Sequence, residues 1–253
     1  MEKIKTNAKK YHYIKNWLLL ANLVLSLGGL SLLLFSGLSS IIAKRILLFS
    51  QNSFVVVALY VFVIDAGYFL LNFPLNFYEG YKLEHRFNLS AQKFSAWFKD
   101  LIKKQIIEFL VFLIAIQALY IFLRNTPDNW WIYMASFWIL LSVVLAKITP
   151  TIIIPLFFKE RKLQNKELKS KILSLVDKSS SKIKNIFVID SSKKTKKSNA
   201  LVCGLGKSRR ILLADNLVSE FSTDEISTVV AHELGHEAAK DTLRLISAAS
   251  IFS

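Results

Sequence analysis

The sequence contains few of the residues that mark disulfide scaffolds or repetitive chains. Its single cysteine, Cys203, excludes a disulfide-based fold, because no second thiol exists to pair with it. Eight glycines and four prolines in 253 residues exclude a collagen-like or low-complexity chain. Acidic residues are also scarce, at 18 Asp and Glu against 33 Lys and Arg. The abundance of Leu, Ile, Val and Phe excludes intrinsic disorder.

The chain is apolar and basic at the same time. Apolar residues make up 53% of the sequence, the mean hydropathy is +0.40 and the formal net charge is +15. Membrane spans joined by basic loops separate these two properties. A nucleic-acid footprint is the alternative source of the charge, but the basic residues are spread over several loops without a recognition motif. We therefore expect a lipid bilayer as a partner, and no nucleic acid.

Long apolar runs with few charges divide the chain into two parts. A helical span needs about 20 residues. The runs predict a membrane domain over residues 1–158, with spans at about 17–40, 54–78, 106–123 and 130–146. Residues 159–241 are then expected to form a smaller domain outside the bilayer, and residues 242–253 to begin a further span.

The basic residues alternate between the ends of these predicted spans. The N-terminal tail holds five lysines, the next connections hold two, six and one basic residues, and the chain beyond Ala146 is again rich in lysine. The positive-inside rule then places the N-terminus and everything from Lys147 onward in the cytoplasm. The composition, heavy in Lys, Ile, Asn and Phe, favours a bacterial inner membrane over the endoplasmic reticulum.

Polar residues in the second predicted span recur at helical spacing. Asp65, Tyr68, Asn72, Asn76 and Glu79 are three or four residues apart, which places them on one stripe of a helix. Such a stripe can line a water-filled chamber that admits peptides, for which Asp65, Asn72 and Asn76 are candidates. Hydrogen bonding between helices is the alternative, and the sequence leaves both open.

The second half of the chain has mixed periodicity. Leu163 to Asp177 has the pattern of an amphipathic helix, with lysines on the side opposite its apolar residues. Asn185 to Asp190 has the composition of a short strand. Asn199 to Cys203 and Arg210 to Ala214 have the composition of two more strands, joined by a turn at Gly204 to Lys207.

A helix with a chemical motif follows. Ser222 and Glu225 have the spacing of a capping box, which marks a helix N-terminus. The helix then carries the run His232-Glu233-Leu234-Gly235-His236. Histidines at i and i+4 lie on one helical face, so both imidazoles can bind one zinc ion, and the adjacent glutamate can act as the general base toward zinc-activated water. An amphipathic helix with exposed His and Glu is the alternative without chemistry.

A catalytic zinc needs three protein ligands, and the third is not evident. Glu237 follows His236 directly and points elsewhere on the helix. His85 and Cys203 are distant candidates, although a lone cysteine in an apolar strand is more often part of a core.

The chain as a whole resembles the type I CAAX prenyl protease family of integral-membrane zinc endopeptidases. The similar stretches are Tyr78–Lys103, Pro150–Leu168 with its I-x-P-L-F segment, Asp190–Leu217 with its Ser-Asn-Ala run, and His232–Thr242. The chain differs from the family pattern at Ser191, where a glycine is usual, and at Leu201-Val202, where an aromatic pair is usual.

The resemblance implies a gluzincin site. His232 and His236 would bind one zinc ion, Glu233 would be the general base, and the third ligand would be a glutamate on a helix beyond Ser253. Ser198, Asn199 and Ala200 would begin an edge strand that binds the substrate backbone by strand addition. Helices would surround an intramembrane chamber with the zinc at its cytoplasmic end.

The length of the chain bears on this expectation. Thr242 to Ser253 would make only about 18 Å of helix, which ends within a bilayer. We therefore expect a C-terminally truncated member of the family, whose last spans and third ligand are missing.

These observations predict a fold and a function. The expected fold is mainly α, a polytopic membrane helical bundle with a small α+β cytoplasmic zinc-protease domain. The expected function is zinc-dependent hydrolysis of peptide bonds in a peptide or protein substrate, hydrophobic or lipidated. The alternatives are an inactive truncated fragment or peptide-binding membrane module, and a heat-shock-type quality-control membrane protease.

Overall fold

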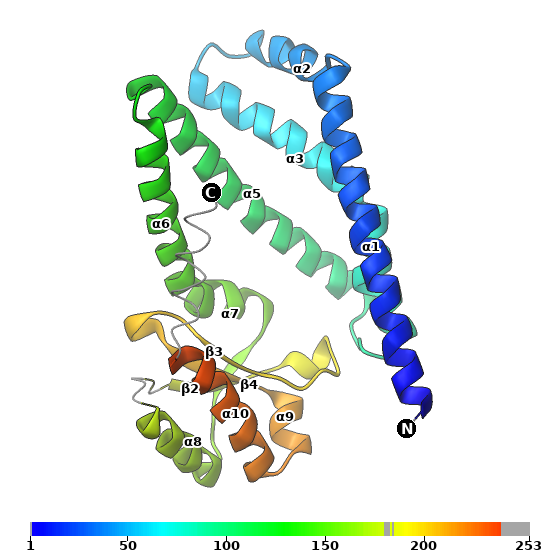
Figure 1. Ribbon diagram of the computed structural model, residues 1–253, viewed down its shortest axis with the longest axis vertical. Helices are drawn as coiled ribbons and strands as arrows, with labels where there is room; N and C mark the ends of the chain where they lie inside the picture. Colours follow the sequence, from blue (N-terminus) through cyan, green and yellow to red (C-terminus); the bar gives the residue numbers. More distant parts are fainter. Residues whose placement is uncertain (1, 180–182, 184, 239–253) are drawn as a thin grey trace. The chain divides into compact units, whose positions relative to one another are not determined.

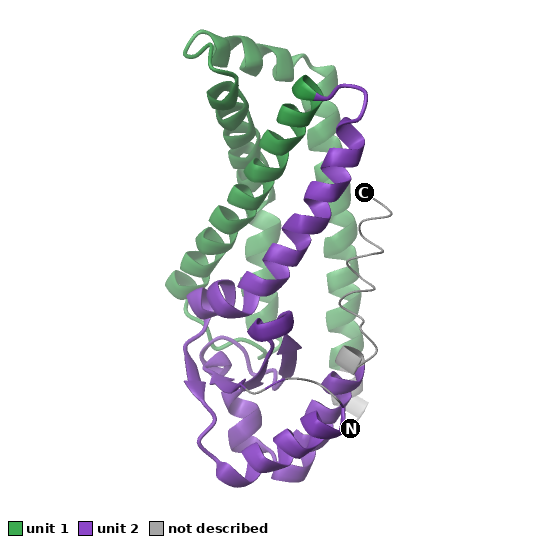
Figure 2. Ribbon diagram, turned by 90° about the vertical axis from the view of Figure 1, so that its left-hand side faces the viewer, with its two compact units in different colours: residues 1–125 green, residues 126–253 purple. Residues whose placement is uncertain are grey.

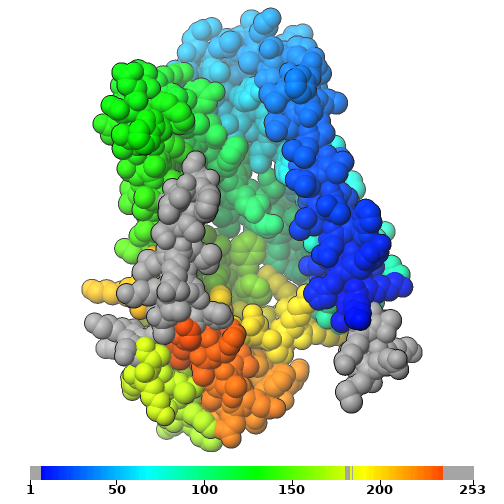
Figure 3. All heavy atoms as spheres, in the orientation of Figure 1, coloured from blue at the N-terminus to red at the C-terminus, as the bar shows by residue number. Residues whose placement is uncertain are grey.

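A computed structural model shows two compact units, residues 1–125 and 126–253 (Figure 2). The structure describes the backbone of residues 2–179, 183 and 185–238, and the side chains of residues 7–179, 183 and 185–235, which are coloured in Figure 3. The predicted start of a further span at 242–253 lies outside the described residues. The two units are taken in turn.

Unit 1 is helical throughout its described length (Figure 1). Its elements are α1 (Glu2–Phe35), α2 (Leu38–Leu47), α3 (Ser53–Phe77), a π-helical turn (Tyr78–Leu83), α4 (Glu84–Arg86) and α5 (Phe94–Asn125). Within this unit α3 packs against α1, α2 and α5. It therefore forms the centre of the bundle.

Four helical segments of the described chain are long and apolar enough to cross a membrane. They are Asn7–Phe35, Ser53–Arg86 and Phe94–Asn125 in unit 1 and Trp130–Phe157 in unit 2. Many of their large apolar side chains are exposed; Leu19, for example, is 67% exposed. Such a surface is stable in lipid and costly in water. The mainly α membrane fold with a small sheet domain, predicted from the sequence, is confirmed.

The first apolar run contains a break that its composition does not reveal. α1 ends at Phe35, and Gly37 has φ of +77°, a left-handed conformation that glycine adopts at little cost. The chain changes direction there and continues as α2, which is only 10 residues long. The predicted end of the first span, near residue 40, therefore lies inside α2.

An aromatic cluster holds the last turns of α3 against the first turns of α5. Phe73 and Phe77 of α3 and Tyr81 of the π-helical turn lie 5.7–6.4 Å, centroid to centroid, from the indole of Trp97. A Cβ atom built at Gly80 would lie 3.0 Å from Trp97 Nε1, so a glycine permits this close approach. Edge-to-face and offset aromatic pairs of this kind stabilise packing beyond their buried area.

Unit 2 joins a long apolar helix to a four-stranded sheet. Its elements are α6 (Trp130–Ile148), a π-helical turn (Thr149–Ile153), α7 (Ile154–Phe157), β1 (Glu160–Lys162), α8 (Lys166–Lys178), β2 (Asn185–Ile189), β3 (Ala200–Cys203), β4 (Arg210–Ala214), α9 (Asp215–Glu220) and α10 (Thr223–Ala238). The strand order is β1-β2-β4-β3. β2 and β4 are parallel, and the two outer strands are antiparallel to their neighbours.

The core of unit 2 lies between the sheet and its helices. Ile211 and Leu213 of β4 are fully buried, as is Ile172 of α8. Leu212 is also buried, so β4 is covered on both faces, as a central strand requires. α10 packs against both α8 and β3.

The strands and helix that the sequence indicated in this region are confirmed, and one strand was missed. β2, β3, β4 and α8 occur where the sequence predicted them. β1 (Glu160–Lys162) was not predicted, because three charged residues carry no apolar alternation.

The division into compact units does not coincide with the predicted domain boundary after Phe158. Unit 2 begins at Thr126 and includes α6, whereas the prediction placed that helix with the other spans. The two divisions differ in kind, because compact units follow packing contacts and the predicted boundary follows the membrane. The domain limits at 158 and 241 stay a prediction.

Candidate active site

The helix that carries the histidines begins at the capping box predicted from the sequence. The Ser222 backbone N–H donates to Glu225 Oε2 at 2.8 Å, and the Glu225 N–H donates to Ser222 Oγ at 3.3 Å. The hydrogen bonds from the backbone and side chain of Ser222 hold the pKa of the Glu225 carboxyl below its usual range. These bonds satisfy N–H groups that a helix start leaves without partners.

An apolar stripe fixes the rotation of α10. Ile226, Val230 and Leu234 are four residues apart and almost fully buried in the core of unit 2. At 100° per residue, His232 lies about 200° and His236 about 240° around the helix from Val230. The helix therefore presents both histidine positions away from the core.

The residues of the motif follow this geometry. The His232 side chain is exposed and that of Glu233 is half-buried. His236 lies one turn further along α10, and its side chain is outside the described part. Two imidazoles from i and i+4 with a neighbouring carboxylate on an accessible face form a donor set that suits zinc. The arrangement therefore fits the metal that the motif implies.

The described side chains do not provide a third ligand. Among them, no group of three or more His, Cys, Asp and Glu residues is close enough to hold a metal ion. The sequence predicted that the third ligand is a glutamate beyond Ser253, which is not among the described residues. That ligand therefore stays a prediction.

The two distant candidates for a third ligand have other partners. His85 Nδ1 lies 2.8 Å from the Tyr81 carbonyl oxygen, and its ring packs on the Tyr81 ring. Burial raises the pKa of the Cys203 thiol to about 11, although the positive charge of Arg210 acts in the opposite direction. In the described structure, neither His85 nor Cys203 belongs to a group of three or more His, Cys, Asp and Glu residues close enough to share a metal ion.

The Ser198-Asn199-Ala200 segment leads into the strand at one edge of the sheet. Ala200 is buried and begins β3, and the Ala214 N–H donates to the Asn199 carbonyl at 2.9 Å. β3 pairs with β4 on one side, and no described strand pairs with its other side. Because α10 packs against β3, the histidine helix and the open strand edge are neighbours in unit 2.

The loop before β3 depends on a carboxylate that the sequence analysis did not single out. Asp215, the first residue of α9, accepts hydrogen bonds from the Ser192 N–H at 2.8 Å and the Ser192 hydroxyl at 2.5 Å. Partial burial acts to raise the pKa of Asp215, but these hydrogen bonds outweigh it and lower the pKa. The signal available in the sequence was an acidic residue directly after a buried strand.

A second carboxylate anchors the same loop. Asp190 accepts hydrogen bonds from the Lys159 N–H at 2.6 Å and from Lys193 Nζ at 2.9 Å. The loop that precedes the edge strand is therefore attached at Asp190 and at Asp215.

The polar stripe of α3 makes contacts between helices of unit 1. Gln105 Nε2 of α5 donates to both carboxylate oxygens of Asp65, at 3.0 and 2.9 Å. The hydroxyls of Tyr68 and Ser26 are 2.9 Å apart, joining α3 to α1. These bonds favour the helix-to-helix alternative for Asp65 and Tyr68.

Two other members of the stripe behave differently. Asn72 is 2% exposed, and its Nδ2 donates to the Tyr68 carbonyl, while its Oδ1 has no partner in the described structure. Asn76 is half-buried. The role of Asp65, Asn72 and Asn76 in lining a chamber stays a prediction.

Two family profiles match the chain in succession. The first describes the N-terminal region of CAAX prenyl proteases, with five membrane helices, and matches residues 2–159. The second describes peptidase family M48 and matches residues 162–253. Together they include the apolar helices and the helix that carries the histidines.

Individual relatives agree with these profiles. An uncharacterized metalloprotease of Bacillus subtilis, YhfN, is 32% identical over 92% of this chain and 54% of its own length. The CAAX prenyl protease 1 of Saccharomyces cerevisiae is 37% identical over 66% of this chain and 37% of its own length. The chain therefore spans about half the length, or less, of the curated relatives it matches.

The fold agrees as well. The crystal structure of S. mikatae Ste24p superimposes with a TM-score of 0.85 at 26% identity, covering 98% of this chain and 60% of that protein. Profiles, relatives and fold lead to one conclusion: the chain belongs to peptidase family M48, in its type I CAAX prenyl protease branch.

Proposed function

We propose that this chain supplies the catalytic helix and substrate-binding edge of a membrane-embedded zinc endopeptidase. The observation that carries the proposal is α10, which is capped at Ser222, held by a buried stripe, and presents an exposed His232 beside a half-buried Glu233. The membership in a family of membrane metallopeptidases supports the same chemistry.

Each residue of the motif has a role in the proposed hydrolysis. His232 and His236 would hold the zinc ion through ring nitrogens. Zinc supplies a Lewis acid that makes water acidic enough to lose a proton near neutral pH and that polarises a peptide carbonyl. Glu233 takes the proton from the attacking water and delivers it to the leaving amine.

The open edge of β3 would hold the substrate. Its unpaired backbone groups can add the substrate main chain as a further strand. The packing of α10 on β3 would bring such a strand next to Glu233. Main-chain binding of this kind depends little on the identity of the substrate side chains. It is therefore compatible with a hydrophobic or lipidated peptide.

The location of the enzyme is part of the proposal. We place it in a bacterial inner membrane with the N-terminus and the catalytic helix in the cytoplasm. The Bacillus subtilis relative supports a bacterial membrane. The alternation of basic loops supports the orientation.

The test replaces the general base and leaves the ligands. Glu233→Gln should keep zinc bound but lower the cleavage rate by about 10²–10⁴-fold, the usual contribution of a general base. Glu220→Gln, an exposed change of the same charge on α9, is the matched control. Zinc is measured by mass spectrometry of the metal, and cleavage with a quenched fluorescent peptide, farnesylated and unmodified.

The outcomes separate the proposal from its alternatives. Unchanged cleavage by Glu233→Gln would overturn the role of the base. If the wild-type chain binds the peptide without cutting it, the inactive peptide-binding module is the correct description.

A further inference from the structure

A cavity opens at the end of unit 1 where α2 connects α1 to α3. Its volume is about 600 Å³, within the usual range of small-molecule sites. α1, α2, α3 and α5 all contribute to its walls, which are mainly apolar: Leu33, Ala43, Val56, Val61, Phe112 and Ile116. The cavity lies wholly within unit 1 and is separate from the histidine helix.

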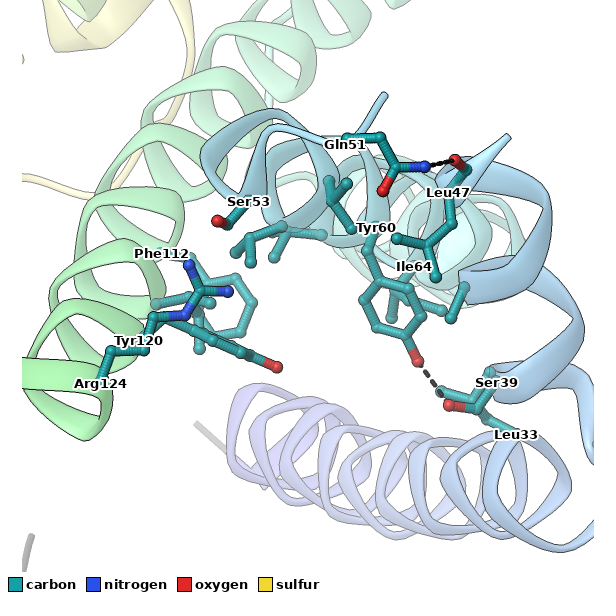
Figure 4. Close-up of a pocket in the computed structure, with 15 residues that line it drawn as sticks. Leu33, Ser39, Leu47, Gln51, Ser53, Tyr60, Ile64, Phe112, Tyr120 and Arg124 are labelled. Carbon is teal, nitrogen blue, oxygen red and sulfur yellow. Dashed lines mark hydrogen bonds between the residues drawn. The ribbon is translucent and has the colours of Figure 1, made fainter. Parts of the chain in front are cut away.

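Polar side chains lie around the cavity, with Ser39 and Tyr60 on one side and Arg124 on the opposite side (Figure 4). The Tyr60 hydroxyl and Ser39 Oγ are 2.7 Å apart, which fixes the Tyr60 ring in the cavity. Gln51 Nε2 donates to the Leu47 carbonyl at 3.1 Å. The Arg124 side chain extends from α5 toward the cavity, and it has no carboxylate partner in the described structure.

Within unit 1, the segments that form this end carry charge of one sign, and the next carboxylate along the chain is Asp128, in the connection that follows Asn125. The sequence has no Asp or Glu from Asn16 to Ile64 or from Phe109 to Asn125. The basic residues of the same segments are Lys44, Arg45 and Arg124. An anion that reaches this end therefore meets three cations and no carboxylate from these segments.

The polar side chains of the cavity lie at the ends of membrane-span candidates, where lipid headgroups are expected. Arg124 is next to the last residue of the apolar segment Phe94–Asn125, and Ser53 is the first residue of the apolar segment Ser53–Arg86. In a bilayer such span ends lie in the interfacial region, while the apolar walls extend into the hydrocarbon. The cavity thus offers an apolar chamber with one cationic side chain, Arg124, at its edge.

We propose that this cavity binds one anionic phospholipid of the surrounding membrane. The acyl chains occupy the apolar chamber, and the phosphate pairs with the Arg124 guanidinium, which can bind it through two parallel hydrogen bonds. A zwitterionic lipid fills the chamber equally well, but its net neutral headgroup gains less from the Arg124 guanidinium. Charge complementarity therefore selects the anionic lipid.

The test compares lipids of opposite headgroup charge. The detergent-solubilised chain is titrated with phosphatidylglycerol and with phosphatidylcholine, and bound lipid is counted by native mass spectrometry. We expect one tightly bound phosphatidylglycerol. Arg124→Gln should weaken it about fivefold, the usual contribution of one basic residue to anionic lipid binding.

Arg45→Gln is the matched control for Arg124→Gln. It removes the same charge from the same end of unit 1, but Arg45 does not line the cavity. Because Arg45 does not line the cavity, it makes no direct contact with the bound phosphate in this proposal, and the control should change phosphatidylglycerol binding less than about twofold. Equal losses in both variants, or equal affinity for both lipids in the wild type, would overturn the assignment to Arg124.

A second pair of variants tests the chamber itself. Ala43→Phe adds a ring to the cavity wall, whereas Ser40→Phe adds the same ring to an exposed position of α2. Only Ala43→Phe should abolish the one-to-one lipid complex. Retained binding in Ala43→Phe, with its helicity unchanged by circular dichroism, overturns the chamber as the site.

Discussion

The sheet region of unit 2 and the helices of unit 1 place apolar side chains in opposite ways. In unit 2 the leucines and isoleucines of the sheet are buried, and Leu213 of β4 is 0% exposed. In unit 1 many large apolar side chains face outward, and Leu19 of α1 is 67% exposed. The sheet region of unit 2 gains stability from a core that excludes water, whereas the outward face of unit 1, like that of α6, suits a lipid environment.

The largest expected effect separates these two kinds of leucine. Leu213→Ala should destabilise unit 2 by about 2–5 kcal/mol, because it leaves a cavity in the core. Leu19→Ala should change stability by no more than about 0.5 kcal/mol, because an outward position leaves no cavity. Hydrogen exchange of the β4 and α1 amides measures both, and similar losses in the two variants would remove the contrast.

The next effect tests the polar contacts inside unit 1. Gln105→Leu removes the partner of the Asp65 carboxylate and should cost about 1–3 kcal/mol, as expected for an unsatisfied polar group. The double variant with Asp65→Leu removes both partners and should recover most of that loss. Thermal unfolding in detergent gives the comparison, and a double variant no more stable than Gln105→Leu contradicts it.

A smaller effect is expected at the start of α10. Ser222→Ala removes the hydroxyl that caps the helix and should cost about 1 kcal/mol. Ser174→Ala removes an exposed hydroxyl from α8 that bonds only to a helix carbonyl, and it should be nearly neutral. Exchange rates of the amides in the first turn of α10 report the difference.

The smallest effect is a pH dependence in the loop before β3. Because the folded pKa of Asp215 is below its usual 3.8, its contribution is complete above that pH and is lost on acidification below it. The Ser192 amide should therefore lose exchange protection as the pH falls through this range. Asp215→Asn should abolish that dependence, and protection in the wild type that is independent of pH contradicts the role.

Local signals explain what could be predicted from the sequence. The capping box, the histidine spacing and strands β2 to β4 each depend on residues a few positions apart, and each was found. The apolar runs likewise predicted the membrane helices, although α5 begins at Phe94, well before the predicted span at 106. The first turns of α5 contain charged residues, so composition alone placed the beginning of the helix too late.

Contacts between distant segments explain the rest. β1 is a strand because it pairs with β2, and the residue types of Glu160-Arg161-Lys162 do not indicate that pairing. The anchoring role of Asp215 depends on Ser192, which is 23 residues away. The break at Gly37 was missed because one glycine in an apolar run does not reveal its φ angle.

The rotation of α10 has a consequence for how this protein can vary. Ile226, Val230 and Leu234 point into the core, and the histidine positions lie on the other side of the same helix. Substitutions at the open edge of β3 or on the accessible face of α10 leave this buried stripe unchanged. Under the proposed function, substrate specificity can therefore change by substitution while the position of α10 is kept.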